Sequence, residues 1–302
     1  MEEPRLHWQP VAILVILALI WGGNMASIKI AARDMAPLFM AGVRSLVASI
    51  GLFIWMKIKG MEVFPSRAIL AHGIVVGVLF GVEFGLIYEG LAFTLASRVY
   101  VLVYTAPFFA ALGAHCFLEG DHLNSWKVSG LAIAFFGIVT LFSRKIGSLS
   151  TEYLPGDLMA LVAGALWGMT TVYIKKFLSP RVLPLQILFY QVFFSVPLLF
   201  LLSLFLESPM VKSVSLIGLS ALFYQCIIVA FLSYLVWFEL IHRYPVSLLH
   251  AFSFFTPVFG VFLSGVLILG EPLRFSLVMA LVLVSAGMAL VNRQTASVPD
   301  AV

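Results

Sequence analysis

The stretch that decides the fold is PVAILVILALIWGGNMASIKIA, residues 10–31, in which Lys29 is the one charged side chain. A membrane-spanning helix needs about 20 mainly apolar residues, so this stretch is long enough to cross a bilayer. Comparable stretches follow, separated by short segments in which Pro, Gly and charged residues gather. We therefore expect an all-α integral membrane protein with ten transmembrane helices. The predicted spans are residues 10–31, 37–57, 68–93, 98–118, 126–143, 157–178, 183–206, 214–241, 246–269 and 275–292.

The composition is that of a chain surrounded mostly by lipid. Hydrophobic residues make up 62% and charged residues 11% of the 302 residues, whereas about a quarter of a soluble domain is charged. The net charge of +4 is spread without a basic run, so we expect a lipid bilayer and no nucleic acid as partner. Cys116 and Cys226 lie in predicted apolar helices, where free thiols are expected rather than a disulfide or a metal site. No cofactor is predicted.

The charges between the spans predict the orientation. The first span lacks a cleavage site of the signal-peptide type, so we expect it to stay in the mature protein. An even number of spans places both termini in one compartment. With the N-terminus inside, ten Lys and Arg residues fall on inner segments and seven on outer ones, leaving Arg44 within a helix. This bias favours cytoplasmic termini in a multi-pass protein of the inner membrane.

The second half of the chain repeats features of the first. Trp21-Gly22 matches Trp167-Gly168 at a separation of 146, and farther along the separation becomes 150. We expect a first repeat over residues 1–146 and a second over 147–302, each with five spans. At the separation of 150, Pro107 falls on Pro257, Glu89 on Glu239, Ser97 on Ser247, and Gly120-Asp121-His122-Leu123 on Gly270-Glu271-Pro272-Leu273.

Five crossings in each half require the two copies to enter the membrane from opposite sides. Inverted repeats are a recurring plan of secondary transporters, because two equivalent arrangements expose one central site alternately to each side. We therefore expect two inverted five-helix repeats within one integrated transmembrane domain. The alternative is a duplication retained only for stability, since duplication alone does not imply transport.

Several motifs stand in an order that is typical of one family. They are Trp21-Gly22-Gly23-Asn24, Arg44 at the end of Phe39-Met40-Ala41-Gly42-Val43-Arg44, Tyr104-Thr105-Ala106-Pro107, Phe255-Thr256-Pro257 and Gly270-Glu271-Pro272-Leu273. Over nearly the whole chain they resemble EamA-type proteins of the drug/metabolite transporter superfamily. The resemblance implies a ten-helix carrier that exports amino acids, aromatic ones included, and related metabolites from bacterial cells. It also implies a central cavity lined mainly by the first four helices of each half.

The chain departs from the family pattern at two places. The position of Arg44 falls near Tyr190 and Gln191 in the second half, so its charge is not duplicated. The acidic loop of the first half carries Asp121 where the family more often has Glu.

Two tryptophans fall near the middle of their spans, although Trp prefers the membrane interfaces. Asn24 lies one helical turn beyond Trp21, and Thr170 lies one turn beyond Trp167. Each half therefore offers an aromatic ring beside a hydrogen-bonding group. We expect all four side chains to line a substrate-binding cavity. The alternative is bulky packing against small residues of neighbouring helices.

Two prolines interrupt spans, and polar aromatic residues lie near them. Pro107 and Pro257 each remove one backbone hydrogen bond, so we expect helix kinks there. Tyr100 and Tyr104 lie close to the first kink, and His250 occupies the position in the second half that is equivalent to Tyr100. These side chains either line the cavity or form an aromatic packing ridge with His250 at the interface.

Ionisable groups inside the membrane are functional candidates, because burying a charge in hydrocarbon is costly. Arg44, Glu83 and Glu89 are such groups. We expect Arg44 either to contact a substrate carboxylate or to have a structural role, by binding backbone carbonyls or by forming an ion pair, for which depth favours Glu89. Glu83 is the candidate for proton coupling, although facilitated diffusion is the preferred mechanism. Tyr190, at the position of Arg44 in the second half, completes the predicted substrate-binding set.

The predicted function is export of small amphipathic metabolites by alternating access. Aromatic rings beside a few polar groups suit amino acids first and lipophilic cations or drugs second. A nucleotide-sugar carrier would need more cationic groups than Arg44 alone. No HExxH, P-loop or GxSxG motif is present, so an enzyme is not expected. Outside transport, the alternative is a membrane receptor or scaffold, since a cavity can bind without transporting.

Overall fold

The computed structural model describes residues 8–119, 123–145, 148–149, 151–243 and 255–292, and nearly all of them are helical. The helices of the first half are α1 Trp8–Ala31, α2 Pro37–Ile58, α3 Arg67–Phe93, α4 Ala96–Val103, α5 Ala106–Phe117 and α6 Ser125–Phe142. Those of the second half are α7 Leu154–Phe177, α8 Pro184–Leu206, α9 Leu216–Phe223, the π-helical η1 Tyr224–Leu232, α10 Ser233–Arg243, α12 Phe255–Phe259, the π-helical η2 Gly260–Ile268 and α13 Phe275–Asn292. A short antiparallel hairpin joins the halves, β1 Ser143–Lys145 with β2 Ser148–Leu149.

The helix lengths confirm a multi-pass integral membrane protein. Among the described residues, seven helical stretches are long and apolar enough to cross a membrane, and three shorter apolar helices accompany them. Each of the ten coincides with a predicted span. The seven are 11–31, 37–58, 67–93, 96–117, 154–177, 184–206 and 216–237, and the shorter ones are 125–141, 255–268 and 275–290. That all ten cross the membrane, and that the halves are inverted, stay predictions.

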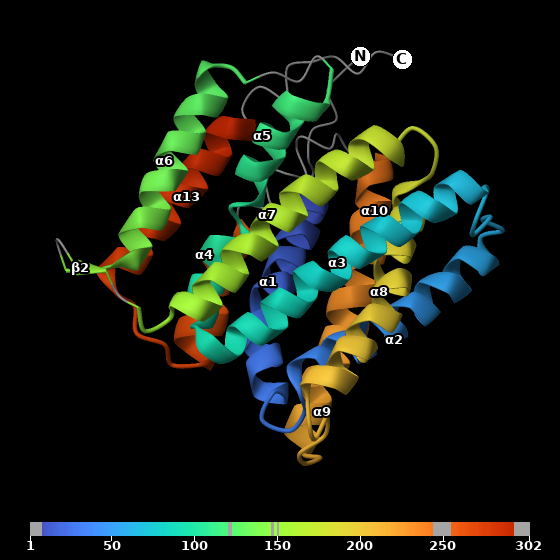
Figure 1. Cartoon of the computed structure of the whole chain (residues 1–302), viewed down its shortest axis with the longest axis horizontal. Helices are drawn as coiled ribbons and strands as arrows, with labels where there is room; N and C mark the ends of the chain where they lie inside the picture. Colours follow the sequence, from blue (N-terminus) through green and yellow to red (C-terminus); the bar gives the residue numbers. More distant parts are fainter. Residues whose placement is uncertain (1–7, 120–122, 146–147, 150, 244–254, 293–302) are drawn as a thin grey trace.

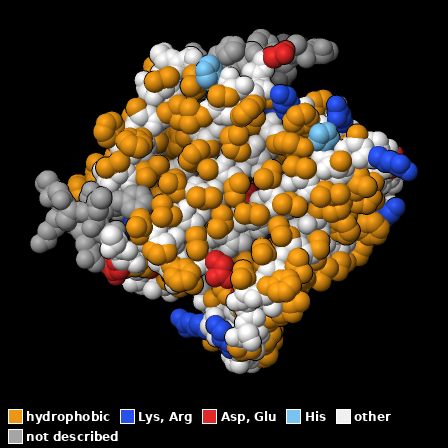
Figure 2. All heavy atoms as spheres, viewed as in Figure 1, with side chains coloured by type: hydrophobic (Ala, Val, Ile, Leu, Met, Phe, Trp, Pro, Cys, Tyr) orange, Lys and Arg blue, Asp and Glu red, His pale blue; other side chains and the backbone are white. Residues whose placement is uncertain are grey.

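The helices form a tilted bundle in which segments far apart in sequence lie together. α3 packs against α7 and α8, and α6 packs along α13 (Figure 1). Hydrophobic side chains cover most of the visible face, while Lys and Arg side chains gather at its margins (Figure 2). Large apolar residues are exposed on this surface, Phe205 at 76% and Leu216 at 80% among them. Such a surface is suited to lipid rather than to water.

Breaks in the helices fall where the backbone loses a partner or changes its winding. The fourth predicted span divides after Val103, and α5 restarts with Pro107 in its first turn, which confirms the predicted break. Pro257 lies within α12. Residues 244–254, which precede this helix, lie outside the described ranges, so a kink at Pro257 stays a prediction. The π-helical η1 lies inside the eighth span without a proline, a change of winding that hydrophobicity does not reveal.

Carboxylates of the second half cap two helices of the first half. Glu207 accepts hydrogen bonds from the amides of Leu38, at 2.7 Å, and Phe39, at 3.0 Å, in the first turn of α2. Glu271 accepts from the first two amides of α4, at 2.7 and 2.9 Å. The first amides of a helix have no partner within it, and anions are favoured at this end of the helix dipole. These contacts therefore tie the two halves together.

Two further carboxylates act at the same end of the bundle. Asp34 accepts from the hydroxyls of Ser213, at 2.6 Å, and Ser215, before α9. These hydroxyls hold the pKa of Asp34 below its ordinary value. Its stabilising contribution is therefore present at neutral pH and is lost only as the pH falls through that lowered pKa. Asp157 pairs with Arg98. We call this end of the bundle, marked by Asp34, Asp157, Glu207 and Glu271, the sealed end.

A stripe of glycines lets α3 approach α8 closely. A Cβ on Gly77 would overlap the Cβ of Phe194 and lie 2.9 Å from the carbonyl oxygen of Tyr190. A Cβ on Gly85 would meet only the tips of Leu38 and Leu199, at 3.3 and 3.7 Å. Close packing is the main attraction between helices in a bilayer, so the first position is the more demanding.

We predict that Gly77→Ala destabilises the protein by roughly 1–3 kcal/mol, because the added methyl meets backbone that cannot rotate away. Gly85→Ala is the matched control on the same stripe and should cost less than about 1 kcal/mol, because leucine tips can adjust. Unfolding of the detergent-solubilised proteins, followed by circular dichroism, measures both. Equal losses for the two variants would contradict the packing argument.

Candidate functional site

A central cavity of about 670 Å³ lies between the two halves. Residues from helices of both halves surround it, mostly apolar and aromatic with a few polar groups. Those that matter for the argument are Trp21, Asn24, Met25, Arg44, Glu83, Phe84, Ile87, Tyr100, Tyr104, Pro107, Trp167, Thr171, Gln191, Tyr234 and Trp237. A concave, largely apolar pocket with a few placed polar groups is the usual form of a small-molecule site.

The cavity reaches the surface at the end of the bundle opposite the sealed end. There its lining includes the exposed residues Lys175, Ser179 and Pro184. We call this the cavity end. Toward the sealed end the lining stops at Met25 and Ile87, which are 6% and 3% exposed. The structure is therefore accessible from one side and closed on the other.

The structure brings most of the predicted substrate-binding residues together. Six of the nine line the central cavity, and Glu83 and Pro107 line it too. His250 lies outside the described residues. The six are Trp21, Asn24, Arg44, Tyr100, Tyr104 and Trp167. That they bind a substrate stays a prediction.

Two predicted residues do not line the cavity. Thr170 is 1% exposed within the packed helices, and Thr171 lines the cavity in its place. The side chains of Thr170 and Thr171 point in directions 100° apart around α7, and this difference decides which of them faces the cavity. Tyr190 is fully buried and donates a hydrogen bond to the carbonyl of Val63 at 2.6 Å, while Gln191 faces the cavity. Both corrections concern the direction of a side chain, not the helix that carries it.

Arg44 is the central charge of the cavity. It is 2% exposed, and its guanidinium lies 4.3 Å from the centre of the Phe84 ring. It also lies beside the hydroxyl of Tyr234. Its Nε and Nη1 have no hydrogen-bond partner, and neither does the Oδ1 of Asn24. Unpartnered polar atoms are rare in buried sites, and a ligand is one explanation for them.

Glu83, not Glu89, is the carboxylate that acts electrostatically on Arg44. Glu89 lies beside Glu207 near the sealed end. At 1.5 Å per residue, Arg44 is roughly 10 Å from the start of α2, while Glu83 is roughly 15 Å and Glu89 roughly 6 Å from the end of α3. The two acids therefore differ from Arg44 in depth by similar amounts, and depth does not decide between them. The expectation that Glu89 is the better match for Arg44 is wrong, because six residues turn the side chain to another face of the helix.

Two aromatic groups form opposite parts of the lining. The ring of Trp21 lies 5.4 Å from that of Trp237, and its indole nitrogen donates to the hydroxyl of Ser233 at 2.8 Å. The ring of Trp167 meets that of Tyr104 edge to face at 5.5 Å. Each pair joins one half of the chain to the other. Both predicted tryptophans thus reach the same cavity, where they offer flat apolar surfaces.

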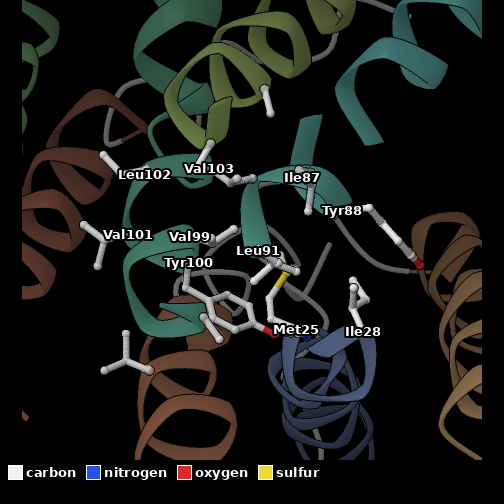
Figure 3. Packing of buried hydrophobic residues seen from close by; sticks show 14 of the residues in the cluster. Met25, Ile28, Ile87, Tyr88, Leu91, Val99, Tyr100, Val101, Leu102 and Val103 are labelled. Atoms are coloured by element: carbon white, nitrogen blue, oxygen red, sulfur yellow. Dashed lines mark hydrogen bonds between the residues drawn. The ribbon is translucent and has the colours of Figure 1, made fainter. Parts of the chain in front are cut away.

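The hydroxyl of Tyr100 is occupied by the backbone of α1. It accepts from the amide of Met25 at 3.2 Å and donates toward the carbonyls of Trp21, at 2.7 Å, and Gly22, at 2.8 Å. Figure 3 shows the ring of Tyr100 extending from α4 with its oxygen beside Met25. Tyr100 therefore positions the segment that carries Trp21 and Asn24, and its hydroxyl is not free for a solute.

Residues of the second half support the same segment, and the sequence analysis missed them. Ser264 in η2 accepts from the amide of Ala26 at 3.1 Å and donates to the carbonyl of Gly22 at 2.6 Å. Tyr224 donates to the carbonyl of Ile20 at 2.6 Å. The sequence shows each of these residues only as a hydroxyl group within an apolar span. Such residues are common in membrane helices, so the sequence alone does not indicate their supporting role.

We predict that Tyr100→Phe reduces transport per folded molecule, because α1 loses the hydroxyl that orients its cavity-lining side chains. Tyr190→Phe is the matched control, since it deletes a buried hydroxyl that also donates to a carbonyl but lies away from the cavity. Both variants should lose about 1 kcal/mol of stability. Uptake into proteoliposomes, normalised to folded protein, separates them. Equal transport by both variants would show that Tyr100 is only a packing residue.

The sequence and the fold of this chain are similar to those of known proteins. The model of the EamA-like transporter family matches residues 9–143 and, separately, residues 154–293. A solved crystal structure superposes with a TM-score of 0.63 at 21% identity, covering 94% of this chain and 96% of the other. That likeness supports the fold alone.

Full-length relatives also carry transporter names. The chain is 27% identical over 286 residues to the probable amino-acid metabolite efflux pump of Salmonella typhimurium, covering 92% of each chain. It is 24% identical over 277 residues to the uncharacterized transporter YoaV of Bacillus subtilis, covering 91% of this chain and 94% of the relative. With two family matches that together span most of its residues, this chain belongs to the EamA-like transporter family.

Proposed function

We propose that this protein exports small zwitterionic metabolites, amino acids foremost, by alternating access around the central cavity. The observation that carries the proposal is the buried guanidinium of Arg44, whose Nε and Nη1 lack partners and whose side chain lines the cavity. A guanidinium binds a carboxylate through parallel hydrogen bonds that are stronger than those between neutral groups. The naming of one relative as an amino-acid metabolite efflux pump supports the same substrate class.

The remaining lining suits the other parts of such a solute. The unpartnered Oδ1 of Asn24 and the carboxylate of Glu83 are acceptors for an ammonium group. The aromatic pairs Trp21 with Trp237 and Trp167 with Tyr104 offer flat surfaces to an apolar side chain. A solute that carries a carboxylate, an ammonium group and an apolar side chain on one carbon would find a partner for each of these groups.

The proposed architecture has ten transmembrane helices in two inverted repeats. Two separate family matches, one in each half, support a division near residues 1–146 and 147–302. With the termini in the cytoplasm, as the charge bias predicts, the cavity end faces the cytoplasm. An exporter that rests in this form has its site open to the compartment from which it takes up its substrate.

A second candidate substrate is a lipophilic cation. Glu83 and the aromatic lining favour it, since cations are attracted to aromatic faces. Arg44 opposes it by repulsion in a low-dielectric site. One transport assay distinguishes the two substrate classes. Replacing Arg44 should weaken the transport of a solute that bears a carboxylate and strengthen the transport of a solute that carries only a positive charge.

We predict that Arg44→Gln lowers counterflow of radiolabelled L-phenylalanine in proteoliposomes by about 10- to 100-fold, as expected for losing hydrogen bonds to a charged group. Lys176→Gln removes an exposed cation near the cavity end that does not line the cavity, and should transport normally. Phenethylamine, which lacks the carboxylate, provides the comparison solute. Increased phenethylamine transport by the Gln variant, with phenylalanine transport retained, would favour the lipophilic cation.

We propose facilitated diffusion, with Glu83 as the counter-charge of Arg44 rather than as a proton carrier. We predict that an imposed pH gradient does not drive phenylalanine accumulation by the native protein, and that Glu83→Gln alters affinity without creating or removing such accumulation. Glu89→Gln is the control, since Glu89 does not line the cavity. The measurement is phenylalanine flux with and without the gradient. Accumulation that vanishes in Glu83→Gln, with exchange intact, would make Glu83 the coupling site.

A further inference from the structure

A second pocket of about 380 Å³ lies at the sealed end. α1, α3 and the segment after α1 form most of its wall, and Leu269 closes one side. Its lining includes Ile28, Lys29, Arg33, Leu91 and Ala92. The two pockets share no lining residue.

One helical turn separates the two linings on the face of α1 that carries Met25 and Ile28 and on the face of α3 that carries Ile87 and Leu91, and Tyr88 on another face of α3 also lines the second pocket. Met25 on α1 and Ile87 on α3 line the central cavity, whereas Ile28 and Leu91 line the second pocket. Three residues along α1 and four along α3 correspond to roughly 5 Å. Figure 3 shows these side chains, with Met25 and Ile28 on α1 below Ile87 and Leu91 on α3. We call Met25, Ile28, Ile87 and Leu91 the plug.

The plug is apolar and is held by polar contacts around it. All four side chains are at most 6% exposed and belong to one packed cluster. Beside them, Lys29 of α1 donates to the carbonyl of Thr94 at 2.6 Å, just after the end of α3. Lys29 also lies 3.9 Å from Glu271, which caps α4. Separating α1 from α3 therefore requires these contacts to change.

Two cations border the second pocket, and each has an acid nearby that also accepts hydrogen bonds from other groups. Lys29 and Arg33 are on its wall. Glu271 accepts from two amides of α4, and Asp34, next to Arg33, accepts from hydroxyls of Ser213 and Ser215. The rest of the wall is mostly apolar. This combination suits an organic carboxylate with an apolar body.

We propose that the second pocket is a release-side binding site for the carboxylate end of the transported solute, and that the solute reaches it by crossing the plug between α1 and α3. The choice of ligand rests on the proposed function. The position of the plug rests on geometry alone, so the two are tested separately.

The plug is tested with single cysteines and no substrate, in a protein carrying Cys116→Ser and Cys226→Ala. Ser179→Cys and Lys212→Cys, both at exposed residues, mark the cavity end and the sealed end. An impermeant methanethiosulfonate reagent should label Ile87→Cys at least tenfold faster from the Ser179 side. It should label Leu91→Cys at least tenfold faster from the Lys212 side. Labelling of both from one side would overturn the proposed barrier, and the two markers also report the orientation in the membrane.

The binding site is tested with L-phenylalanine presented from each side of phosphatidylcholine proteoliposomes. Arg33→Gln should raise the KM about tenfold from the sealed end and leave it unchanged from the cavity end. Arg181→Gln, an exposed arginine outside both pockets, should change neither. Equal effects from both sides would overturn the site. An effect that needs added phosphatidylglycerol would assign the pocket to a lipid headgroup and also overturn it. If native protein moves no phenylalanine while the cysteines behave as expected, the proposed function fails and the plug stands.

Discussion

Every backbone amide that is removed from water must find a hydrogen-bond partner inside the protein. The structure of the sealed end depends on the partners of the first amides of two helices. Lipid offers no hydrogen-bond acceptor in place of water. The first amides of α2 and α4 are satisfied by Glu207 and Glu271, which belong to the opposite half of the chain. Breaking either contact leaves the first amides of that helix without their partner. The two halves are therefore held together at this end by the helices' own chemistry.

The same demand shapes the centre of α1, where the cavity is built. Tyr100 and Ser264 bind amides and carbonyls that are four residues apart in the helix, each bridging groups that an α-helix normally pairs directly. Side chains inserted next to the backbone ladder are a recognised cause of helix bending. One of the two hydroxyls comes from each half. The orientation of Trp21 and Asn24 therefore depends on how the halves sit against each other.

Hydrophobic length was enough to predict where the helices lie, because the bilayer sets a minimum apolar span. The break at Pro107 followed from the missing amide of proline. The side chains were harder. Thr170 and Tyr190 were misjudged by one residue, which changes the direction of a side chain by about 100°, and the partner of Arg44 was misjudged by six residues along α3. Direction is set by neighbouring helices, and a single sequence carries no record of them. Gln191, Tyr234 and Trp237 were missed for the same reason.

The charges at the centre bear on which solutes can cross. Arg44 and Glu83 both line the cavity and act on each other electrostatically, and the proposed function makes Glu83 the counter-charge of Arg44. A zwitterion adds no net charge, and its carboxylate and ammonium find partners of opposite sign. A singly charged solute would leave one uncompensated charge in a low-dielectric interior, where its cost is several kcal/mol. A zwitterion thus leaves the net charge of the cavity unchanged on loading, so the loaded form faces no extra electrostatic barrier to reorientation. Exchange and net flux are then both feasible without a coupling ion, which is why facilitated diffusion fits this site.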